Sequence, residues 1–550
     1  MADLRPSLSA TQNGTYQWLL VLNIGSRTIQ VNTGDPVTIT GKDGEVYEFK
    51  GGLGPANYER TLDLWASTPS PRSQSFQVFL DFDIALQIAR GTPLFAASGE
   101  LSQWYEGTPW EERRVVLRGT LEEPSYGPLN EPFAFSLTEN PIEDRAVIPE
   151  PSWTVQEGVT FTEGATVGPD PGIIGAQYPL VIGAPGQAPG VGTTSTFRSN
   201  DVPATPVLLV RRDTSSSTLT NFRLLIAGGE VTTTDIKIVN LTNESKTFST
   251  SIIATDTDGL GQSYSYVNPT LGKDPAEGDQ LYAIWDPDDG GGVRNWWGTG
   301  TLRGAGDVIR WALQQSTLRV DHSRLGELTI LNSFKVDAFI NAPISPWSWV
   351  SSNLLPLLPV SVATGPDGLY VTPWLVAGLS NEDAVEVIEE GRNAIRQGNV
   401  VYTSSDSVFN EITIRFAPNA STGSPALRRV ITSQGNHDAS DPNSSPNLWC
   451  TRSQGIFGTK RLDIETKVVY DTATAESILQ YMARRHSHPR REVIYSVPRK
   501  MDWLRPGDVV KVTDADLHLS EVIGYLGSIA YGDDSLTVQV IIFEPLVFSR

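Results

Sequence analysis

The sequence predicts a β-dominated α+β protein that is divided into several domains. Its 550 residues are enough for three or four domains, each able to bury its own core. The 49 Gly and 37 Pro residues imply many turns, which is typical of β-rich structure. Short segments rich in β-branched and aromatic residues recur along the chain, while only a few segments space their apolar residues as a helix does.

Residues 1–148 are expected to form one domain of strands with a single short helix. The helix would be capped by Asp81 or Asp83, carry Ile88 on its apolar stripe and end at Gly91. β-Branched and aromatic residues predict strands at 37–40, 76–80, 115–121 and 133–137.

The next two regions differ in their content of Pro and Gly. Residues 149–200 are rich in both, which predicts either an arm that lies along a surface or a plain linker between domains. Residues 201–300 are expected to be a β-rich domain. Its expected strands lie at 207–210, 222–226 and 236–239, and Asp-rich turns lie at 256–259 and 286–290.

The Asp-rich turns raise the question of Ca²⁺, because hard cations prefer clustered oxygens. An EF-hand loop that began at Asp286 would need Glu at its twelfth position, where this chain has Trp297. Plain turns built from Asp and Gly are therefore the favoured interpretation.

Residues 301–440 are expected to form an α+β domain. Apolar residues at 305–313 keep helical spacing. A capping box at 380–383 predicts the start of a second helix, whose apolar stripe would lie within 384–395. A strand is expected at 411–416.

Residues 441–550 are expected to form a small α+β module whose elements follow one another closely. Alternating apolar and polar residues predict a strand at 462–470. A helix at 472–485 comes next, because Asp471 can accept its first N–H groups and Pro489 prevents its continuation. The remaining expected elements are strands at 493–497, 509–512 and 536–542, with a Gly507-Asp508 turn before the middle one.

The charge of the chain bears on its partners. The formal net charge is −21, and residues 441–550 hold 14 Asp and Glu against 13 Lys and Arg, so the first 440 residues carry most of it. An acidic surface argues against wrapping DNA, since phosphate binding needs cations. It suits either a channel that DNA crosses without sticking or simple solubility.

Neither a secretion signal nor a membrane span is expected. The first five residues lack a basic start before a long apolar core. The apolar segment 343–362 is broken by Pro346, Pro356 and Pro359, which predicts a buried loop. Cys450 is the single cysteine, so no internal disulfide forms, which fits assembly in a reducing cytoplasm.

The sequence contains no catalytic motif that we recognise. It has no P-loop, no paired metal-binding histidines on a helix, no nucleophile elbow and no paired-cysteine zinc pattern. We therefore expect no enzymatic activity, no cofactor and no metal site.

A basic run at 484–491 stands out in this acidic chain. It would serve either as a dock for an acidic neighbouring subunit or the DNA backbone, or simply as a solvated rim, which is the simpler interpretation. His486 and His488 lie within it, but the surrounding cations disfavour a metal ion. The candidate interface or docking residues are Arg484, Arg485, Arg490 and Arg491.

Tryptophan is concentrated in the middle of the chain. Such residues can stack on sugars or anchor an interface, but a plain core is the simpler interpretation, because Trp311 lies in an expected helix. The group consists of Trp285, Trp296, Trp297, Trp311, Trp347 and Trp349.

Residues 456–461, the strand and helix that follow them, the basic run, and the turn at 504–510 succeed one another with almost no spacer. This order resembles the C-terminal part of tail hub (baseplate hub) proteins of long-tailed bacteriophages. Residues 60–119 resemble the N-terminal barrel of hub-like tail proteins more loosely, and residues 178–183 are similar to a segment of the same proteins.

The resemblance implies tail-tube-like β-barrel domains together with smaller α+β modules, with a second barrel at 201–290 or 400–440. It also implies a structural ring, usually a trimer, at the distal end of the virion tail, assembled in the host cytoplasm. This ring would join the hexameric distal tail ring to the three-fold tip. The implied partners are the distal tail protein, the tape measure protein, a central tail fibre or tip protein, and genomic DNA crossing the lumen without specific binding.

Two other classes of function stay open at the level of sequence. One is a tail-associated adhesin or glycan-binding tip protein that uses exposed tryptophans. The other is a β-rich glycan hydrolase, because the spacing of paired carboxylates in space cannot be read along a chain.

Overall fold

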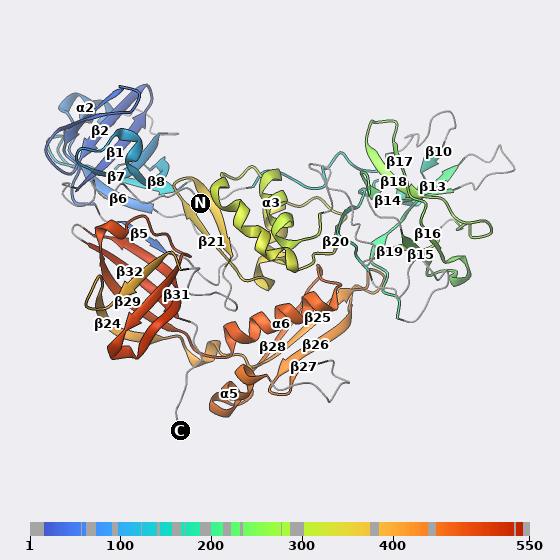
Figure 1. Cartoon of the computed structure of the whole chain (residues 1–550). Helices are drawn as coiled ribbons and strands as arrows, with labels where there is room; N and C mark the ends of the chain where they lie inside the picture. Colours follow the sequence, from blue (N-terminus) through green and yellow to red (C-terminus); the bar gives the residue numbers. More distant parts are fainter. Residues whose placement is uncertain are drawn as a thin grey trace.

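The computed structural model describes residues 16–542 except for the gaps given at the end of this paragraph. Within the described residues the protein is β-dominated, with several separate sheets and a few helices, as expected for this α+β class (Figure 1). The gaps are 57, 62–72, 91–96, 123, 140–143, 157–166, 170, 187–199, 213–221, 232–234, 277, 287–301, 374–383, 438–446 and 533–534.

The first eight-stranded sheet, here called the N-terminal sheet, has the order β3-β4-β2-β1-β7-β8-β9-β6. β3 and β6 are the two edge strands of this sheet. No ladder of backbone hydrogen bonds pairs them with each other, so the sheet does not close into a barrel. A single bridge between Leu53 and Val78 nevertheless joins the segment after β4 to β6. The strands are β1 (Tyr16–Ile24), β2 (Arg27–Asn32), β3 (Val37–Thr40), β4 (Val46–Gly51), β6 (Ser73–Val78), β7 (Ser98–Tyr105), β8 (Arg114–Leu121) and β9 (Phe133–Glu139).

The short helix expected beside this sheet is α2 (Phe82–Ala89), and Asp81 is its N-cap residue. The Asp81 side chain makes no capping hydrogen bond. It pairs instead with Lys50 Nζ at 2.6 Å. Ala85 and Ile88 are buried against the sheet core, which confirms the apolar stripe. Gly91, its expected end, lies outside the described residues.

The second large sheet, here called the C-terminal sheet, has the order β23-β30-β31-β32-β29-β24. A strand from near the N-terminus, β5 (Tyr58–Thr61), also pairs with β31 of this sheet (Figure 1). The other strands are β23 (Glu386–Glu389), β24 (Ile395–Tyr402), β29 (Arg491–Pro498), β30 (Val509–Asp514), β31 (Leu519–Tyr531) and β32 (Ser535–Ile542).

The capping box at 380–383 predicted a helix, and this prediction is wrong for residues 386–389, which form the strand β23. Ile388 pairs in parallel register with Val512 and is fully buried. A contact made more than a hundred residues away therefore overrides the local helix signal. The capping box itself lies outside the described residues.

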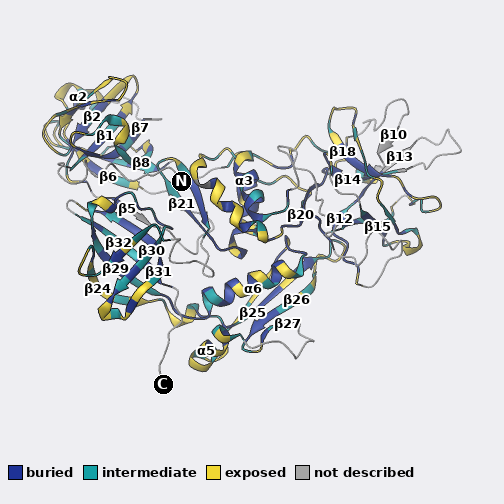
Figure 2. Cartoon of the chain, viewed as in Figure 1, coloured by how far each residue is buried: buried dark blue, intermediate teal, exposed yellow. Residues whose placement is uncertain are grey.

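Buried residues of the N-terminal and C-terminal sheets belong to one hydrophobic cluster. It extends from Trp18 and Phe135 of the first sheet to Tyr495 and Ile542 of the second. Figure 2 shows buried residues along β29, β31 and β32. The two ends of the chain thus build one body, which no local segment builds alone.

A central unit connects this body to the rest of the chain. It contains α3 (Ala305–Gln315), the 3₁₀ segment η4 (His322–Ser333), α4 (Pro346–Asn353) and the hairpin of β21 (Val360–Gly365) and β22 (Gly368–Pro373). Helix α3 confirms the spacing at 305–313.

The prediction of a buried loop at 343–362 is wrong for much of this segment, because α4 lies within it. Ser345 accepts a hydrogen bond from Ser348 N, and Pro346 occupies the first turn, where a missing N–H costs nothing. Proline thus starts this helix instead of breaking it. No helix among the described residues is long and apolar enough to cross a membrane.

Two smaller open sheets lie on the far side of the central unit (Figure 1), and their strands include those expected at 222–226 and 236–239. One has the order β10-β13-β14-β18-β17 and the other β12-β19-β15-β16. The strands are β10 (Val167–Pro169), β12 (Thr205–Pro206), β13 (Leu208–Arg212), β14 (Phe222–Gly228), β15 (Ile236–Asn240), β16 (Phe248–Thr250), β17 (Ala254–Thr257), β18 (Ser263–Val267) and β19 (Leu281–Trp285). Within the Pro/Gly-rich region, β11 (Leu180–Ile182) pairs with β20 (Ala338–Ile340) of the central unit.

The last four-stranded sheet has the order β27-β26-β25-β28 and carries α6 (Thr472–His486) on one face (Figure 1). Helix α6 confirms the expected helix, and Asp471 Oδ2 accepts from Thr474 N at 2.7 Å. The strand expected at 462–470 is shorter: it ends at Glu465, and three consecutive buried residues, 468–470, precede the helix. The other elements are β25 (Glu411–Pro418), β26 (Pro425–Thr432), β27 (Gly435–His437), β28 (Arg461–Glu465) and α5 (Leu448–Phe457).

The two regions expected to hold a second barrel, 201–290 and 400–440, contribute their described strands mainly to these open sheets. Residues 441–550, expected to form one module, are divided between two sheets. β28 and α6 belong to the last four-stranded sheet, whereas β29–β32 belong to the C-terminal sheet.

Candidate functional site

The N-terminal and C-terminal sheets are joined by β5, which comes from the N-terminal part of the chain but pairs in the C-terminal sheet. β5 pairs antiparallel with β31, in a register that places Tyr58 opposite Tyr531. Tyr58 is buried, and its hydroxyl donates to Glu139 Oε1 at 3.4 Å. Thr364 of β21 donates to the other oxygen of Glu139 at 2.6 Å. The Glu139 carboxylate at the end of β9 therefore connects β5 to the β21–β22 hairpin.

A second set of contacts, here called the joint, connects β7 and β8 to the segment between β29 and β30. The Tyr105 hydroxyl donates to Asp502 Oδ2 at 2.8 Å. Arg114 donates through Nη2 to the carbonyl of Leu504 at 3.0 Å, and its Nη1 lies 3.5 Å from Asp502 Oδ1. Burial, reinforced by the Asp502 charge, raises the pKa of Tyr105, which keeps this phenol protonated as a donor.

The joint continues into a stack of aromatic rings and a cation. Arg499, in the 3₁₀ turn after β29, places its guanidinium 3.8 Å from the ring centroid of Tyr16. The Tyr16 ring contacts those of Trp18 and Tyr105. Burial raises the pKa of Tyr16 even though Arg499 opposes the shift.

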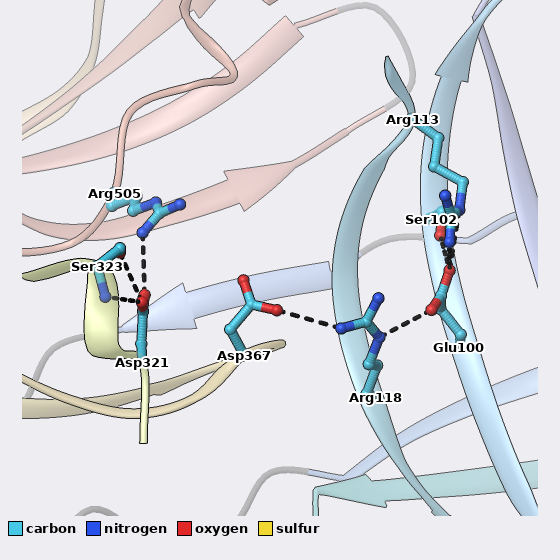
Figure 3. A network of polar contacts seen from close by, with 8 residues as sticks. All are labelled: Glu100, Ser102, Arg113, Arg118, Asp321, Ser323, Asp367 and Arg505. Carbon is cyan, nitrogen blue, oxygen red and sulfur yellow. Dashed lines mark hydrogen bonds and ion pairs between the residues drawn. The ribbon is translucent and has the colours of Figure 1, made fainter. Parts of the chain in front are cut away.

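Ion pairs also connect the N-terminal sheet to the central hairpin (Figure 3). Glu100 accepts hydrogen bonds from Arg113 at 2.8 Å and from Arg118 at 2.8 Å. Arg118 also pairs with Asp367, in the turn of the β21–β22 hairpin, at 3.1 Å. Burial alone would raise the pKa of Glu100, but the two arginines outweigh it and hold this pKa below its ordinary value.

A separate group of polar contacts reaches the C-terminal sheet through the turn before β30. Arg505 Nη1 donates to Asp321 Oδ2 at 3.3 Å, and Asp321 also caps η4 by accepting from Ser323 N at 3.0 Å (Figure 3). The expected turn at Gly507-Asp508 is confirmed: Gly507 has a φ of +91°, and Asp508 accepts from Arg505 N at 2.7 Å.

The basic run proves to be largely internal. Arg485 and Arg490 are buried, with exposed fractions of 6% and 5%, so a solvated rim does not describe them. The Arg485 guanidinium contacts the hydroxyl of Tyr481 one helical turn earlier. Arg484 and Arg491 are half-buried. Their use as a dock stays a prediction.

Each of the two histidines of the basic run contacts one aromatic ring. The His486 ring contacts Phe409, and the His488 ring contacts Trp449. Burial, helped by arginine charge nearby, lowers the pKa of His486 to about 3 and that of His488 to about 4. Within the part of the chain that the structure describes, no three His, Cys, Asp or Glu residues gather as metal ligands.

The tryptophans of the middle region belong to cores wherever the structure describes them. Trp285, Trp311, Trp347 and Trp349 are all buried, and Trp285 Nε1 donates to Thr205 at 3.0 Å. They offer no sugar-stacking surface. Trp296 and Trp297 lie outside the described residues.

The described Asp-rich turn is a plain turn. Asp258 accepts from the backbone N–H of Leu260 and Gln262 and from the Tyr178 hydroxyl. Asp256 pairs with Arg223 at 2.9 Å. The four residues after Asp286 lie outside the described ranges.

The joint could not be predicted from the sequence. Tyr105 and Asp502 are 397 residues apart, and neither belongs to a motif. The only local signal was the turn at 507–508, next to which Asp502 and Leu504 lie.

Comparison with known proteins gives one match to a family model. Residues 354–522 match a family described as "Putative phage tail protein", which covers less than half of the chain. The matched range begins at the end of α4 and ends within β31, so it includes the central hairpin, the sheet under α6 and most of the C-terminal sheet. No curated protein matches the chain in sequence.

Three solved structures are similar over much of the chain. A 43 kDa tail protein of prophage MuSo2 from Shewanella oneidensis is 11% identical, with a TM-score of 0.32 and coverage of 96% of this chain and 97% of that one. A tail protein from Neisseria meningitidis MC58 is 10% identical, with a TM-score of 0.32 and coverage of 96% of each chain. A chain of the virion of a native gene transfer agent particle is 10% identical, with a TM-score of 0.33 and coverage of 71% and 87%.

Proposed function

We propose that this protein is a structural, non-enzymatic hub of a phage tail tip or baseplate. Three copies would form a ring that joins the hexameric distal tail ring to the three-fold tip. The observation that carries this proposal is that the N-terminal and C-terminal sheets share one core and that β5, which lies between β4 and β6 in the sequence, pairs within the C-terminal sheet. The family match at 354–522 supports the assignment to tails.

In this proposal each of the two sheets corresponds to one tail-tube-like barrel. The N-terminal sheet comes close to closure, because Gly54 N donates to the carbonyl of Gln77 and Phe79 N donates to that of Gly52, both at 2.8 Å. The second barrel would then be the C-terminal sheet rather than the regions at 201–290 or 400–440. Its end strands β23 and β24 are linked by a short turn in which Ala394 N donates to the carbonyl of Glu389 at 3.1 Å.

Two barrels per copy explain how a trimer can match a hexameric ring. Three copies present six similar sheets toward the tail tube and three copies of everything else toward the tip. The smaller sheets beyond the central unit would be peripheral domains (Figure 1). The partners would be the distal tail protein, the tape measure protein and a central fibre or tip protein.

The acidic charge fits a lumen that genomic DNA crosses during ejection. The chain as a whole has a formal net charge of −21, and a lumen wall of that sign would repel phosphate instead of binding it. Arg484 and Arg491, the half-buried members of the basic run, remain our candidates for docking an acidic neighbour.

Mass measurement followed by electron microscopy of the purified full chain tests this function. We expect trimers, and ring-shaped averages in which the N-terminal and C-terminal sheets alternate around a central bore. A chain that stays monomeric at high concentration, or that lies as a separate knob on the outside of the virion, would contradict the proposal. Selective binding on a glycan array would favour an adhesin instead.

A further inference from the structure

Three exposed aromatic side chains lie at one end of the N-terminal sheet and are here called the aromatic patch. Phe79, directly after β6, is 54% exposed, and Phe82, at the start of α2, is 62% exposed. The third, Tyr126, is exposed and stacks on Phe133 with 4.7 Å between the ring centroids. Phe133 pairs with Val78, the residue before Phe79, so all three rings belong to this end of β6. Large exposed apolar side chains that gather in this way mark an interaction surface.

The aromatic patch also carries a carboxylate without a partner. Asp81 pairs with Lys50, but Asp83, in the first turn of α2, is exposed and forms no ion pair with any residue that the structure describes. A surface that binds the patch should therefore offer apolar side chains around a cation.

Helix α5 offers this combination. Leu448, Arg452 and Ile456 follow one another at intervals of four residues, so they share one face of the helix. All three are exposed, Leu448 by 65% and Ile456 by 45%, whereas Cys450 and Ser453 point away from this face and are buried. Arg452 forms no ion pair within the described part of the chain, so its charge is available to a partner.

The exposed apolar residues of β23 and β24 fit the aromatic patch less well. Ile395 is the most exposed of them, but the arginines on either side of it in the chain are already paired. Arg392 pairs with Glu389 at 2.9 Å, and Arg396 pairs with Asp514 at 3.2 Å. A carboxylate that approached this surface would compete with these pairs, whereas Arg452 of α5 has no such competitor.

The aromatic patch and the exposed face of α5 lie far apart in one chain. Helix α2 is at the upper left of the molecule and α5 at its lower edge (Figure 1), so the two surfaces do not meet within one copy. We propose that the aromatic patch of one copy docks on the exposed face of α5 of the next copy, with Asp83 opposite Arg452. Such a contact joins different surfaces of identical chains, and its repetition closes into a ring when the rotation between copies allows it. The inference rests on the proposed function, because it names the surfaces through which the copies of the ring meet.

Reversal of the two charges in the full chain tests the contact. Sedimentation velocity over a range of concentrations measures the dissociation constant of the assembly. Asp83→Lys and Arg452→Glu should each raise this constant at least about tenfold, because each places like charges opposite one another. The chain that carries both changes should regain most of the wild-type affinity. Both residues are exposed, so thermal unfolding of each variant should match that of the wild type.

A third variant removes an aromatic anchor without changing any charge. Phe82→Ala should also raise the dissociation constant about tenfold, because exposed aromatic residues dominate the binding energy of such contacts. The matched control is Arg392→Glu, which reverses an exposed charge outside both surfaces and should leave assembly unchanged.

The outcomes separate the contact from the ring. Rings that form normally in both single charge variants would overturn the contact and leave the proposed function standing. Assembly that the single changes weaken and the double change does not restore would also overturn it. Open strings of copies that the double change restores would support the contact and contradict the ring, and a wild-type chain that stays monomeric at high concentration would contradict both.

Discussion

The Tyr105 hydroxyl donates to the Asp502 carboxylate at 2.8 Å across 397 residues of chain. The pair fastens the end of β7 in the N-terminal sheet to the turn after β29 in the C-terminal sheet. Both residues are buried, so water cannot replace the contact. The two sheets are consequently one body, and a change at the joint should be felt in both.

Removing the donor tests this coupling. Tyr105→Phe should lower the free energy of unfolding by about 2 kcal/mol, because Asp502 loses a hydrogen bond to a buried charge. Hydrogen exchange should become faster in β7 and in the segment 499–504 together. Tyr402→Phe, which alters a half-exposed tyrosine on β24, serves as the control. Faster exchange confined to β7 would show that the sheets move independently.

We expect the protein to lose stability on acidification because of His486 and His488. Their folded-state pKa values, about 3 for His486 and about 4 for His488, lie below the ordinary value for histidine. The unfolded chain therefore takes up protons first as pH falls through about 6.5, and the neutral folded form loses stability from there downward. At about pH 5 the loss should reach roughly 2 kcal/mol for His486.

Denaturant titrations between about pH 7.5 and pH 5 measure this loss. The variant His486→Gln should flatten the pH dependence, whereas His322→Gln, at an exposed position in η4, should leave it unchanged. An equal slope in the wild type and in His486→Gln would show that other groups control acid stability.

Lys237 of β15 and Asp201 form an ion pair at 2.5 Å in which neither side chain is exposed. Lys237→Met should cost about 3–5 kcal/mol, because it removes the cation of a buried ion pair. Thermal unfolding would detect this as a lower midpoint for the part of the chain that holds β12–β19. Lys50→Met, which removes a mostly exposed partner of Asp81, should have at most a small effect.

Gly119 of β8 lies so close to β9 that a Cβ atom would overlap the carbonyl of Thr138. Gly119→Ala should destabilise the N-terminal sheet by about 1–3 kcal/mol or prevent its folding, because two paired strands would have to separate. Gly455→Ala in α5 is the matched control, since nothing lies within 4 Å of its Cβ position and alanine favours helix. Equal melting of both variants would contradict the close approach.

Elements that depend on neighbouring residues in the chain could be predicted. Helix α6, its Asp471 cap and the turn at Gly507-Asp508 were expected and are present. In each case the residues that supply the stabilising contact lie within a few positions of one another.

The sequence by itself determined the β-rich class, the acidic charge and the local caps and turns. The tertiary structure decided which sheet each strand joins: β5 crosses to the C-terminal sheet, and 386–389 become a strand beside β30. It also decided that Arg485 and Arg490 lie inside rather than on a rim. The reason is physical: burial and strand pairing depend on residues hundreds of positions away. The local sequence pattern of a strand does not indicate which distant strand will pair with it.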